Sequence, residues 1–150
     1  MNIYYHPLYT KGIDSKSTFP KERYDLIKEQ LVVSELSNII TIKTPTEVEI
    51  EDIYRAHAKE YVDAFLNSDL SEKQVREIGL KPWTNKIIQR TLLLTGGSLC
   101  ALDDIYNGAA VAANMAGGTH HAFRDRGSGF CIFNDLAICA IKAIEKYNYN

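Results

Sequence analysis

The sequence predicts an α/β fold built around an open parallel sheet. Short apolar runs alternate along the chain with segments whose apolar residues recur every three or four positions. The run Ala109–Asn114 consists almost entirely of small apolar residues, which is typical of a strand buried on both faces of a parallel sheet. The segment after Thr84 carries the longest helical period of the chain. These three patterns together indicate strands that are connected through helices.

The first part of the chain is expected to hold two strands with a helix between them. Ile3–Tyr5 is a short apolar run that predicts a strand, and residues 6–20 predict a loop. Residues 22 to 37 carry apolar side chains at helical spacing, and the acidic Glu22 suits the first turn of a helix. Ile39–Ile42 is β-branched at nearly every position and predicts the second strand.

Shorter helices are expected to follow the second strand. Thr46 can cap a Glu-rich helix that runs towards Ala56, and Lys59–Leu66 predicts a second helix. The polar run that ends at Gly79 predicts a short exposed helix, because glycine is the preferred residue just past a helix end.

The longest helix is predicted between Thr84, as its cap, and Asn107–Gly108, at its end. Gly96–Gly97 lies inside this helix and costs about 1 kcal/mol per glycine relative to alanine, so we expect close packing against a neighbouring element there. The strand Ala109–Asn114 comes next. After a glycine-rich loop, Asn134 is expected to cap the last helix.

Composition excludes several classes of protein. At 150 residues, 45% of them hydrophobic, the chain fits one domain with an ordinary core. A net charge of −2 and a pI near 6.1 give no electrostatic footprint for nucleic acid. We expect no membrane span, because no apolar run approaches the roughly 20 residues required, and no secretory signal, because the N-terminus lacks a basic region followed by an apolar one. Three cysteines without a CxxC pair predict no disulfide framework and a reducing, cytoplasmic setting.

Reactive groups are concentrated in the loop between Gly117 and Asp135. It contains the adjacent His120 and His121, four of the nine glycines and one of the three cysteines. In open α/β sheets, ligands bind beyond the carboxyl ends of the strands, which is where a loop following Ala109–Asn114 should lie. Imidazole is the side chain that most often serves as general acid or base, so the loop is expected to form a cleft with proton-transfer chemistry. Phe130 and Phe133 are expected to provide flat apolar walls.

Other residues of the chain allow further interpretations. Cys131, close to two histidines, could serve as a thiolate nucleophile, although a small buried thiol is the commoner state. His6 and His57 are interpreted as structural. The run Arg124–Arg126 is interpreted as a solvated, mutually paired charge cluster, and Asp135 as an acid in the first turn of the last helix.

The loop resembles the central motif of the histone deacetylase superfamily. The matching stretches are AGGTHHAF at 116–123, DRGSGFC at 125–131 and FNDLA at 133–137, and they are especially similar to the bacterial deacetylase-like and acetoin-utilisation-like branch. Weaker similarity extends upstream to FPKERY at 19–24 and RAHAKEYVDAF at 55–65. The resemblance implies an arginase/deacetylase-like fold with an open parallel sheet.

The resemblance also implies a zinc-dependent site that hydrolyses acetylated amines, either acetyl-lysine or a small acetylated amine. His121 would act as general base and then as general acid, and His120 would be its electrostatic partner. Gly129 and Phe130 would line the tunnel for the acyl-lysine stem. The zinc would polarise the acetamide carbonyl and activate a water molecule.

The chain departs from the family pattern at its end. In the family, the zinc ligands are two aspartates and a histidine, and they follow the FND helix, as do the stabilising tyrosine and the aspartates that orient the histidines. Residues 1–150 therefore match the N-terminal portion of an incomplete deacetylase-like domain, with no metal ligands and no zinc expected on this chain alone. A separately encoded C-terminal half would be a partner. The alternatives are a non-catalytic fragment or interaction module, and a thiol hydrolase that uses Cys131 with His121.

Overall fold

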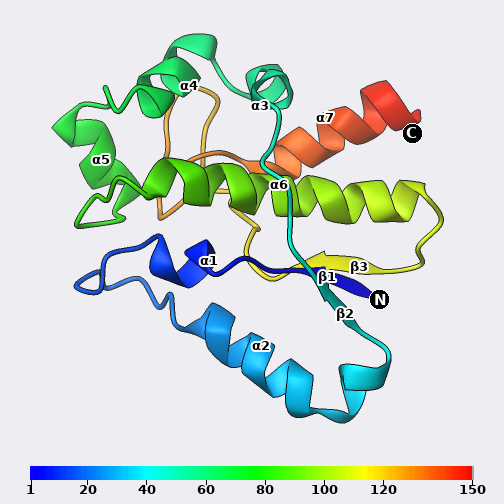
Figure 1. Cartoon of the computed structure of the whole chain (residues 1–150). Coiled ribbons are helices and arrows are strands. Elements are labelled where there is room, and N and C mark those ends of the chain that lie inside the picture. The colour runs from blue at the N-terminus through cyan, green and yellow to red at the C-terminus, as the bar shows by residue number, and fades with distance from the viewer. Residues whose placement is uncertain (150) are drawn as a thin grey trace.

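A computed structural model describes residues 1–149 and places three short parallel strands in one sheet (Figure 1). The strands are β1 (Asn2–Tyr4), β2 (Thr41–Lys43) and β3 (Ala112–Asn114), in the order β2-β1-β3. Ile3 of the central strand pairs with Ile42 on one side and Ala113 on the other. The predicted α/β class with a parallel sheet is confirmed.

Helices account for most of the remaining regular structure. They are α1 (Leu8–Lys11), α2 (Arg23–Val33), the 3₁₀ helix η1 (Glu35–Asn38), α3 (Ile50–Ala56), α4 (Lys59–Leu66), α5 (Glu72–Ile78), α6 (Ile87–Tyr106) and α7 (Asp135–Tyr147). The predicted helix over residues 22 to 37 is divided at Ser34. The backbone of Ser34 is extended (φ −82°, ψ 167°), which ends α2. The Ser34 hydroxyl accepts a hydrogen bond from the Leu36 N–H, and this bond starts the 3₁₀ helix η1.

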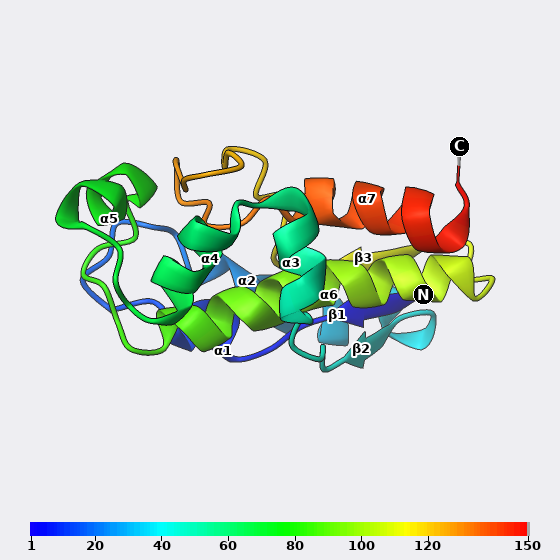
Figure 2. The ribbon, with the colours of Figure 1, turned by 90° about the horizontal axis from the view of Figure 1, so that it is seen from above.

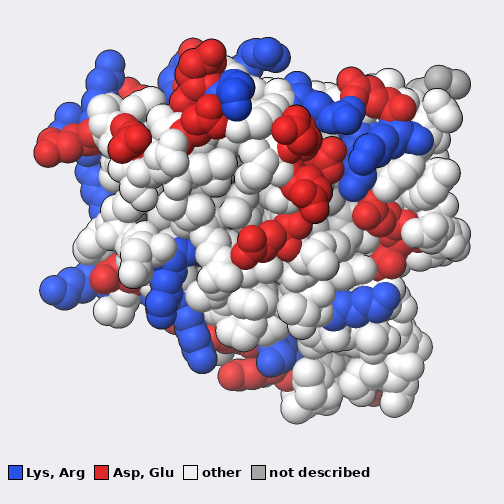
Figure 3. Space-filling model, turned by 45° about the horizontal axis from the view of Figure 1, so that its top comes forward, with Lys and Arg blue, Asp and Glu red and all other residues white. Residues whose placement is uncertain are grey.

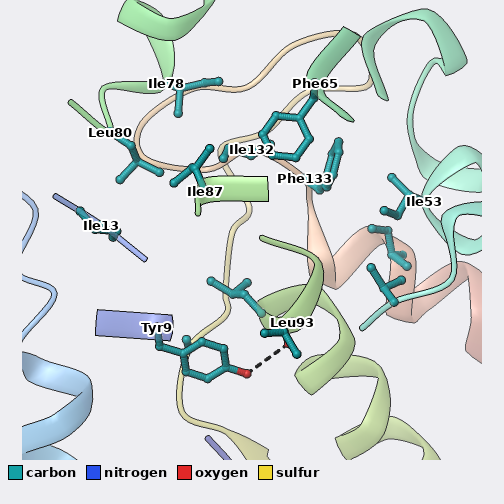
Figure 4. Packing of buried hydrophobic residues seen from close by; sticks show 14 of the residues in the cluster. Tyr9, Ile13, Ile53, Phe65, Ile78, Leu80, Ile87, Leu93, Ile132 and Phe133 are labelled. Atoms are coloured by element: carbon teal, nitrogen blue, oxygen red, sulfur yellow. Dashed lines mark hydrogen bonds between the residues drawn. The ribbon is translucent and has the colours of Figure 1, made fainter. Parts of the chain in front are cut away.

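The helices lie on both sides of the sheet. α6 covers β1 and β3, while α2 lies on the opposite side (Figure 1). α7 packs against α6 and α3, and Figure 2 shows α7 running alongside α6. The core surrounds the first half of α6 and is made by residues from α1, α3, α4 and the loop before α7 (Figure 4). The fully buried Tyr9 donates its hydroxyl proton to the Leu93 carbonyl (Figure 4).

Ion pairs fix α7 against its two neighbouring helices. Lys142 lies 3.7 Å from Asp52 of α3 and 3.3 Å from Asp103 of α6, and its side chain is mostly buried. Arg55 of α3 pairs with Glu145 near the end of α7. These contacts hold the second half of α7 against α3 and α6.

The prediction for Ala109–Asn114 is wrong in two respects. The strand is shorter, and β3 is an edge strand whose residues are all half-buried, with Val111 56% exposed just before it. A sequence of small apolar residues is equally compatible with a central strand, which pairs on both edges, and with an edge strand such as β3, which pairs only with β1 and is covered by α6. Beside β3 lies a hollow of about 520 Å³, which is lined by α6, α7, β3 and Gly117–Gly118.

The predicted close approach at the glycine pair of α6 is confirmed. A Cβ atom on Gly96 would lie 2.0 Å from the Thr46 carbonyl oxygen, and one on Gly97 would lie 2.6 Å from the Asn114 side chain. The chain between β2 and α3 therefore crosses directly over α6. The Val48 N–H donates to the Leu92 carbonyl at this crossing, which anchors the extended segment.

Two of the predicted caps are wrong, and three are confirmed. Thr46 precedes the start of α3 by four residues because it lies in the crossing segment, and the Thr84 hydroxyl donates to the Gly12 carbonyl instead of capping α6. Asn134 caps α7 through the Ala137 N–H. Gly79 ends α5 in the left-handed conformation, and Asn107 ends α6, as expected.

The surface carries charges of both signs. On the face drawn in Figure 3, Lys and Arg are interspersed with Asp and Glu, without a large field of one sign. Among the described residues, no helix combines the length and the apolar character that a membrane span requires.

Candidate active site

The loop from Gly117 to Asn134 follows β3, and its first residues are held by hydrogen bonds to the side chain of Asp135. This carboxylate is only 1% exposed and accepts hydrogen bonds from the Gly118 N–H (3.0 Å), the Thr119 N–H (2.7 Å) and the hydroxyls of Thr119 and Ser98. Gly117 has a φ of +153°, and a Cβ there would lie 2.7 Å from the same carboxylate. Asp135 does stand in the first turn of α7, as predicted, but its main contacts are with the loop.

The region between α3 and α4 holds the same loop from the other side. The buried His57 accepts the Asn134 N–H at its Nε2 (2.9 Å), and the Ala58 N–H donates to the Arg124 carbonyl (2.8 Å). The Tyr61 hydroxyl donates to the Ile132 carbonyl (2.9 Å). Because Nε2 accepts, Nδ1 of His57 carries the proton, and it lies 3.3 Å from the Arg124 carbonyl. The interpretation of His57 as structural agrees with these contacts.

Acidification is expected to destabilise the fold through His57. Burial lowers the pKa of this imidazole below its ordinary value of about 6.5, so the unfolded chain takes up the proton first as the pH falls. His57 therefore contributes stability above about pH 6.5, and that contribution is lost as the pH falls towards the folded-state pKa. Urea unfolding at pH 7.5 and 5.5 measures the loss. His57→Gln keeps an acceptor but does not titrate, and an equal loss in this variant would contradict the assignment.

The rings of the tandem histidines contact each other near the start of the loop. The ring centroids of His120 and His121 are 4.2 Å apart with an interplanar angle of 41°, and both side chains are exposed. Nδ1 of His120 lies 2.9 Å from the Gly118 carbonyl, which can only accept, so this nitrogen carries the proton. A Cβ on Gly129 would lie 3.3 Å from the His121 side chain, so this glycine lets the backbone approach the second ring.

One cavity brings together the tandem histidines and the residues that the family resemblance placed beside them. It has a volume of about 290 Å³, and its walls include His120, His121, Gly129, Phe130 and Cys131. Phe130 is 41% exposed with a φ of +68°, and its N–H donates to the Ile78 carbonyl (2.7 Å). This backbone bond holds its ring at the cavity wall.

The same cavity has a second wall that sequence reasoning missed. It is formed by Phe19, Arg23, Tyr24, Arg90 and Leu94. The FPKERY stretch, which contains Phe19, Arg23 and Tyr24, carries only weak family similarity in the sequence. Arg90 interrupts the apolar face of α6 three residues after Ile87. A charged residue on the buried face of a helix is the sequence signal that could have indicated Arg90 as a residue of the site.

The neighbouring aromatic and charged residues have other roles. Phe133, expected as a cavity wall, is 1% exposed and packs in the core with its ring centroid 5.1 Å from that of Phe65. The prediction is wrong for the cavity of the histidines, because Phe133 points inward with Ile132 and lines only a separate cavity of about 10 Å³. Arg126 pairs with Asp125 at 3.0 Å on the surface, as the charge-cluster interpretation expected.

Cys131 lines the cavity as a buried thiol. It is 6% exposed, and its Sγ lies 3.5 Å from the Gly129 carbonyl. Burial raises the pKa of this thiol above its ordinary value, which disfavours the thiolate that a nucleophile requires. The geometry therefore gives no support to the thiol-hydrolase interpretation.

Comparison with known proteins identifies the family of this chain. The histone deacetylase domain matches residues 17–150. An uncharacterised protein of Picosynechococcus sp. (strain ATCC 27264 / PCC 7002 / PR-6) is 38% identical over 145 residues, which cover 96% of this chain and 47% of that protein. The acetoin utilization protein AcuC of Bacillus subtilis (strain 168) is 34% identical over 131 residues, 82% of this chain and 33% of AcuC. AcuC of Staphylococcus aureus (strain MSSA476) is 28% identical over 154 residues, 97% of this chain and 40% of that protein.

The chain spans less than half the length of these relatives. The domain match nevertheless covers most of the chain and includes the whole loop that carries the tandem histidines. The resemblance inferred from that loop is confirmed, and the chain belongs to the histone deacetylase family.

Proposed function

We propose that this chain contributes the acid–base side of a site that hydrolyses acetylated amines, with acetyl-lysine or a small acetylated amine as substrate. The observation that carries the proposal is the pair of imidazoles in contact on the wall of a cavity at the carboxyl end of the sheet. Membership of the deacetylase family supports the same reaction class.

In this proposal the two histidines have different tasks. His121, whose ring is not held by the loop backbone, takes a proton from the attacking water and then gives a proton to the leaving amine. His120, with its Nδ1–H against the Gly118 carbonyl, stays fixed and stabilises charge on its neighbour. Water adds to the carbonyl carbon, the C–N bond breaks, and the products are a carboxylic acid and an amine. Gly129 and Phe130 would hold the stem of the substrate against the cavity wall.

The zinc that the family resemblance implies does not fit the donors of this chain. Zinc sites use three or four protein ligands, and within residues 1–149 no three His, Cys, Asp or Glu side chains are grouped to hold a metal ion. The roles above are therefore assigned to side chains alone. We propose that zinc ligands come from a C-terminal half of the domain, either continuous with this chain or separately encoded, and that the protein acts in the cytoplasm.

The test is hydrolysis of an acetyl-lysine peptide and of an acetylated diamine, with this chain alone and mixed with the C-terminal half of the Picosynechococcus relative. We expect turnover from the mixture, and His121→Ala should lower kcat by about 100-fold or more, the usual scale for losing a general acid–base. Phe130→Ala should mainly raise KM.

Cys131→Ser is the matched control on the same cavity wall, and it should leave turnover nearly unchanged. Loss of turnover in Cys131→Ser, together with full activity in His121→Ala, would overturn the proposal in favour of thiol chemistry. If the two halves bind each other tightly but the complex hydrolyses neither substrate, the result would favour the non-catalytic interaction module.

A further inference from the structure

The cavity that contains the tandem histidines also carries two guanidinium groups. Arg23 stands at its rim as the first residue of α2, and Arg90 extends from α6 with only 3% of its surface exposed. Both lie near the ring of Phe19, with their Cζ atoms 4.9 and 5.8 Å from its centroid. Two positive charges from distant parts of the sequence therefore converge on one aromatic ring inside the cavity.

Neither guanidinium forms an ion pair within residues 1–149, whereas Arg55, Arg76 and Arg126 each do. Arg90 donates its Nε–H to the Tyr9 carbonyl (3.0 Å), and Arg23 donates from Nη2 to the Tyr24 hydroxyl (3.0 Å). A guanidinium has five N–H donors, so most of them are left for another acceptor. A buried charge without a counter-ion is costly, and an anion in the cavity would remove that cost.

A second observation marks the same place as polar. The hydroxyl of Thr95 is buried in a residue only 1% exposed and has no hydrogen-bond partner. It lines a small inner cavity of about 10 Å³, to which Arg90 and Thr119 also contribute and which shares four of its lining residues with the larger one. Room for about one water molecule next to an unsatisfied hydroxyl and a guanidinium extends the polar region behind the histidines.

Size and shape define the ligand. A water molecule occupies about 30 Å³ of liquid, so a cavity of about 290 Å³ holds far more than the few atoms of an acetyl group. Phe19 and Leu94 offer apolar surface for methylene groups between the histidines and the arginines. The planar, forked guanidinium matches the two oxygens of a carboxylate.

We infer that Arg23 and Arg90 form a subsite for a carboxylate at the far end of the acyl group, so that the substrates include amines acylated with a dicarboxylic acid. This inference rests on the proposed function, and it widens the substrate class from acetyl groups to acyl groups that end in a carboxylate. The scissile carbonyl would face the histidine pair while the terminal carboxylate pairs with the two arginines.

Equilibrium binding to this chain tests the subsite without requiring hydrolysis. The probe is N-methylsuccinamate, and the matched neutral probe is N-methylsuccinamide, which has the same shape with a carboxamide in place of the carboxylate. Titration is followed by calorimetry and by the NMR signals of His121 and of the Arg90 Nε–H. We expect the carboxylate to bind at least about tenfold more tightly than the carboxamide, as two charge-assisted hydrogen bonds allow. Acetate and inorganic phosphate should bind more weakly than the tethered carboxylate.

The variants separate the subsite from general charge. Arg23→Gln lies at the exposed rim and should lose about tenfold in affinity for N-methylsuccinamate. Arg90→Lys keeps the charge without the fork and should lose a similar factor, and a thermal melt checks that this variant, which gives up the Nε–H bond to the Tyr9 carbonyl, is still folded at the temperature of the titration. Arg124→Gln removes an exposed charge of the histidine loop, and Arg124 lies outside the cavity. This variant should bind N-methylsuccinamate with unchanged affinity.

Equal binding of the two succinyl probes, equal losses in Arg23→Gln and Arg124→Gln, or tighter binding of acetate or phosphate would each overturn the inference. Failure of this test together with turnover of acetyl substrates would remove only the subsite. Binding as expected without turnover of any acyl amine would instead remove the proposed function.

Discussion

Gly96→Ala is expected to destabilise the chain by about 3 kcal/mol, at the upper end of the usual cost of overpacking. The added methyl group would meet the Thr46 carbonyl oxygen at 2.0 Å, the Val48 nitrogen at 2.9 Å and the Glu47 carbonyl carbon at 3.0 Å. All three are backbone atoms, so no side-chain rotation relieves the overlap. Either α6 or the crossing segment between β2 and α3 must move, and the Val48 N–H bond to Leu92 would be lost with it.

Urea unfolding followed by circular dichroism gives the free energy of unfolding for this comparison. Gly108→Ala is the control, because a Cβ there meets nothing within 4 Å and only the positive φ of +95° opposes it. We expect the control to lose about 1 kcal/mol from backbone strain. Equal losses in the two variants would show that strain, and not the crossing, sets the requirement for glycine in α6.

Asp135→Ala is expected to have the second large effect, about 3 kcal/mol of lost stability together with release of the histidine loop. The carboxylate accepts four hydrogen bonds, and two of their donors are backbone N–H groups of Gly118 and Thr119. Bonds to charged groups contribute more than neutral ones, and an unsatisfied buried donor costs about 1–3 kcal/mol. Removing the carboxylate leaves both amides, which directly precede His120 in the sequence, without an acceptor.

Hydrogen exchange at the Gly118 and Thr119 amides reports the release directly, and denaturant unfolding reports the total. Asp125→Ala provides the control in the same loop, because its ion pair with Arg126 is exposed and should contribute less than about 1 kcal/mol. Protection of the two amides in Asp135→Ala, at the level of the unmodified chain, would show that the loop is held by its other contacts, chiefly those to His57 and Tyr61.

Much of the fold was predictable because local patterns determine it. The capping side chain of Asn134 and the glycine after Ile78 each act over a few residues, and each lies where the sequence indicated. The β-branched run Ile39–Ile42 predicted the second strand only in part, because β2 begins at Thr41 and Ile39 ends η1. The edge position of β3 was not predictable, because the number of neighbouring strands depends on long-range pairing. Thr46 failed as a cap for the same reason, since its segment is held by α6 far along the chain.

The site was predictable only where its residues are adjacent in sequence. His120, His121, Gly129 and Phe130 share one loop, and the structure places them on one cavity. Arg23 and Arg90 reach that cavity from two other helices, so no spacing in the sequence connects them. Asp135 was interpreted from its helix position alone, because the sequence does not show that the loop folds back over its carboxylate.

The open edge of β3 connects further growth of the sheet with the cavity of the tandem histidines, because Gly117 and Gly118 line both that cavity and the hollow beside β3. Parallel strands end at the same edge of a sheet, so any strand that added to β3 in that sense would deliver its own following loop next to Gly117 and the tandem histidines. Its flanking side chains would fill the hollow between α6 and α7. Pairing of a further strand with β3 and the arrival of new side chains beside His120 and His121 would then be one event.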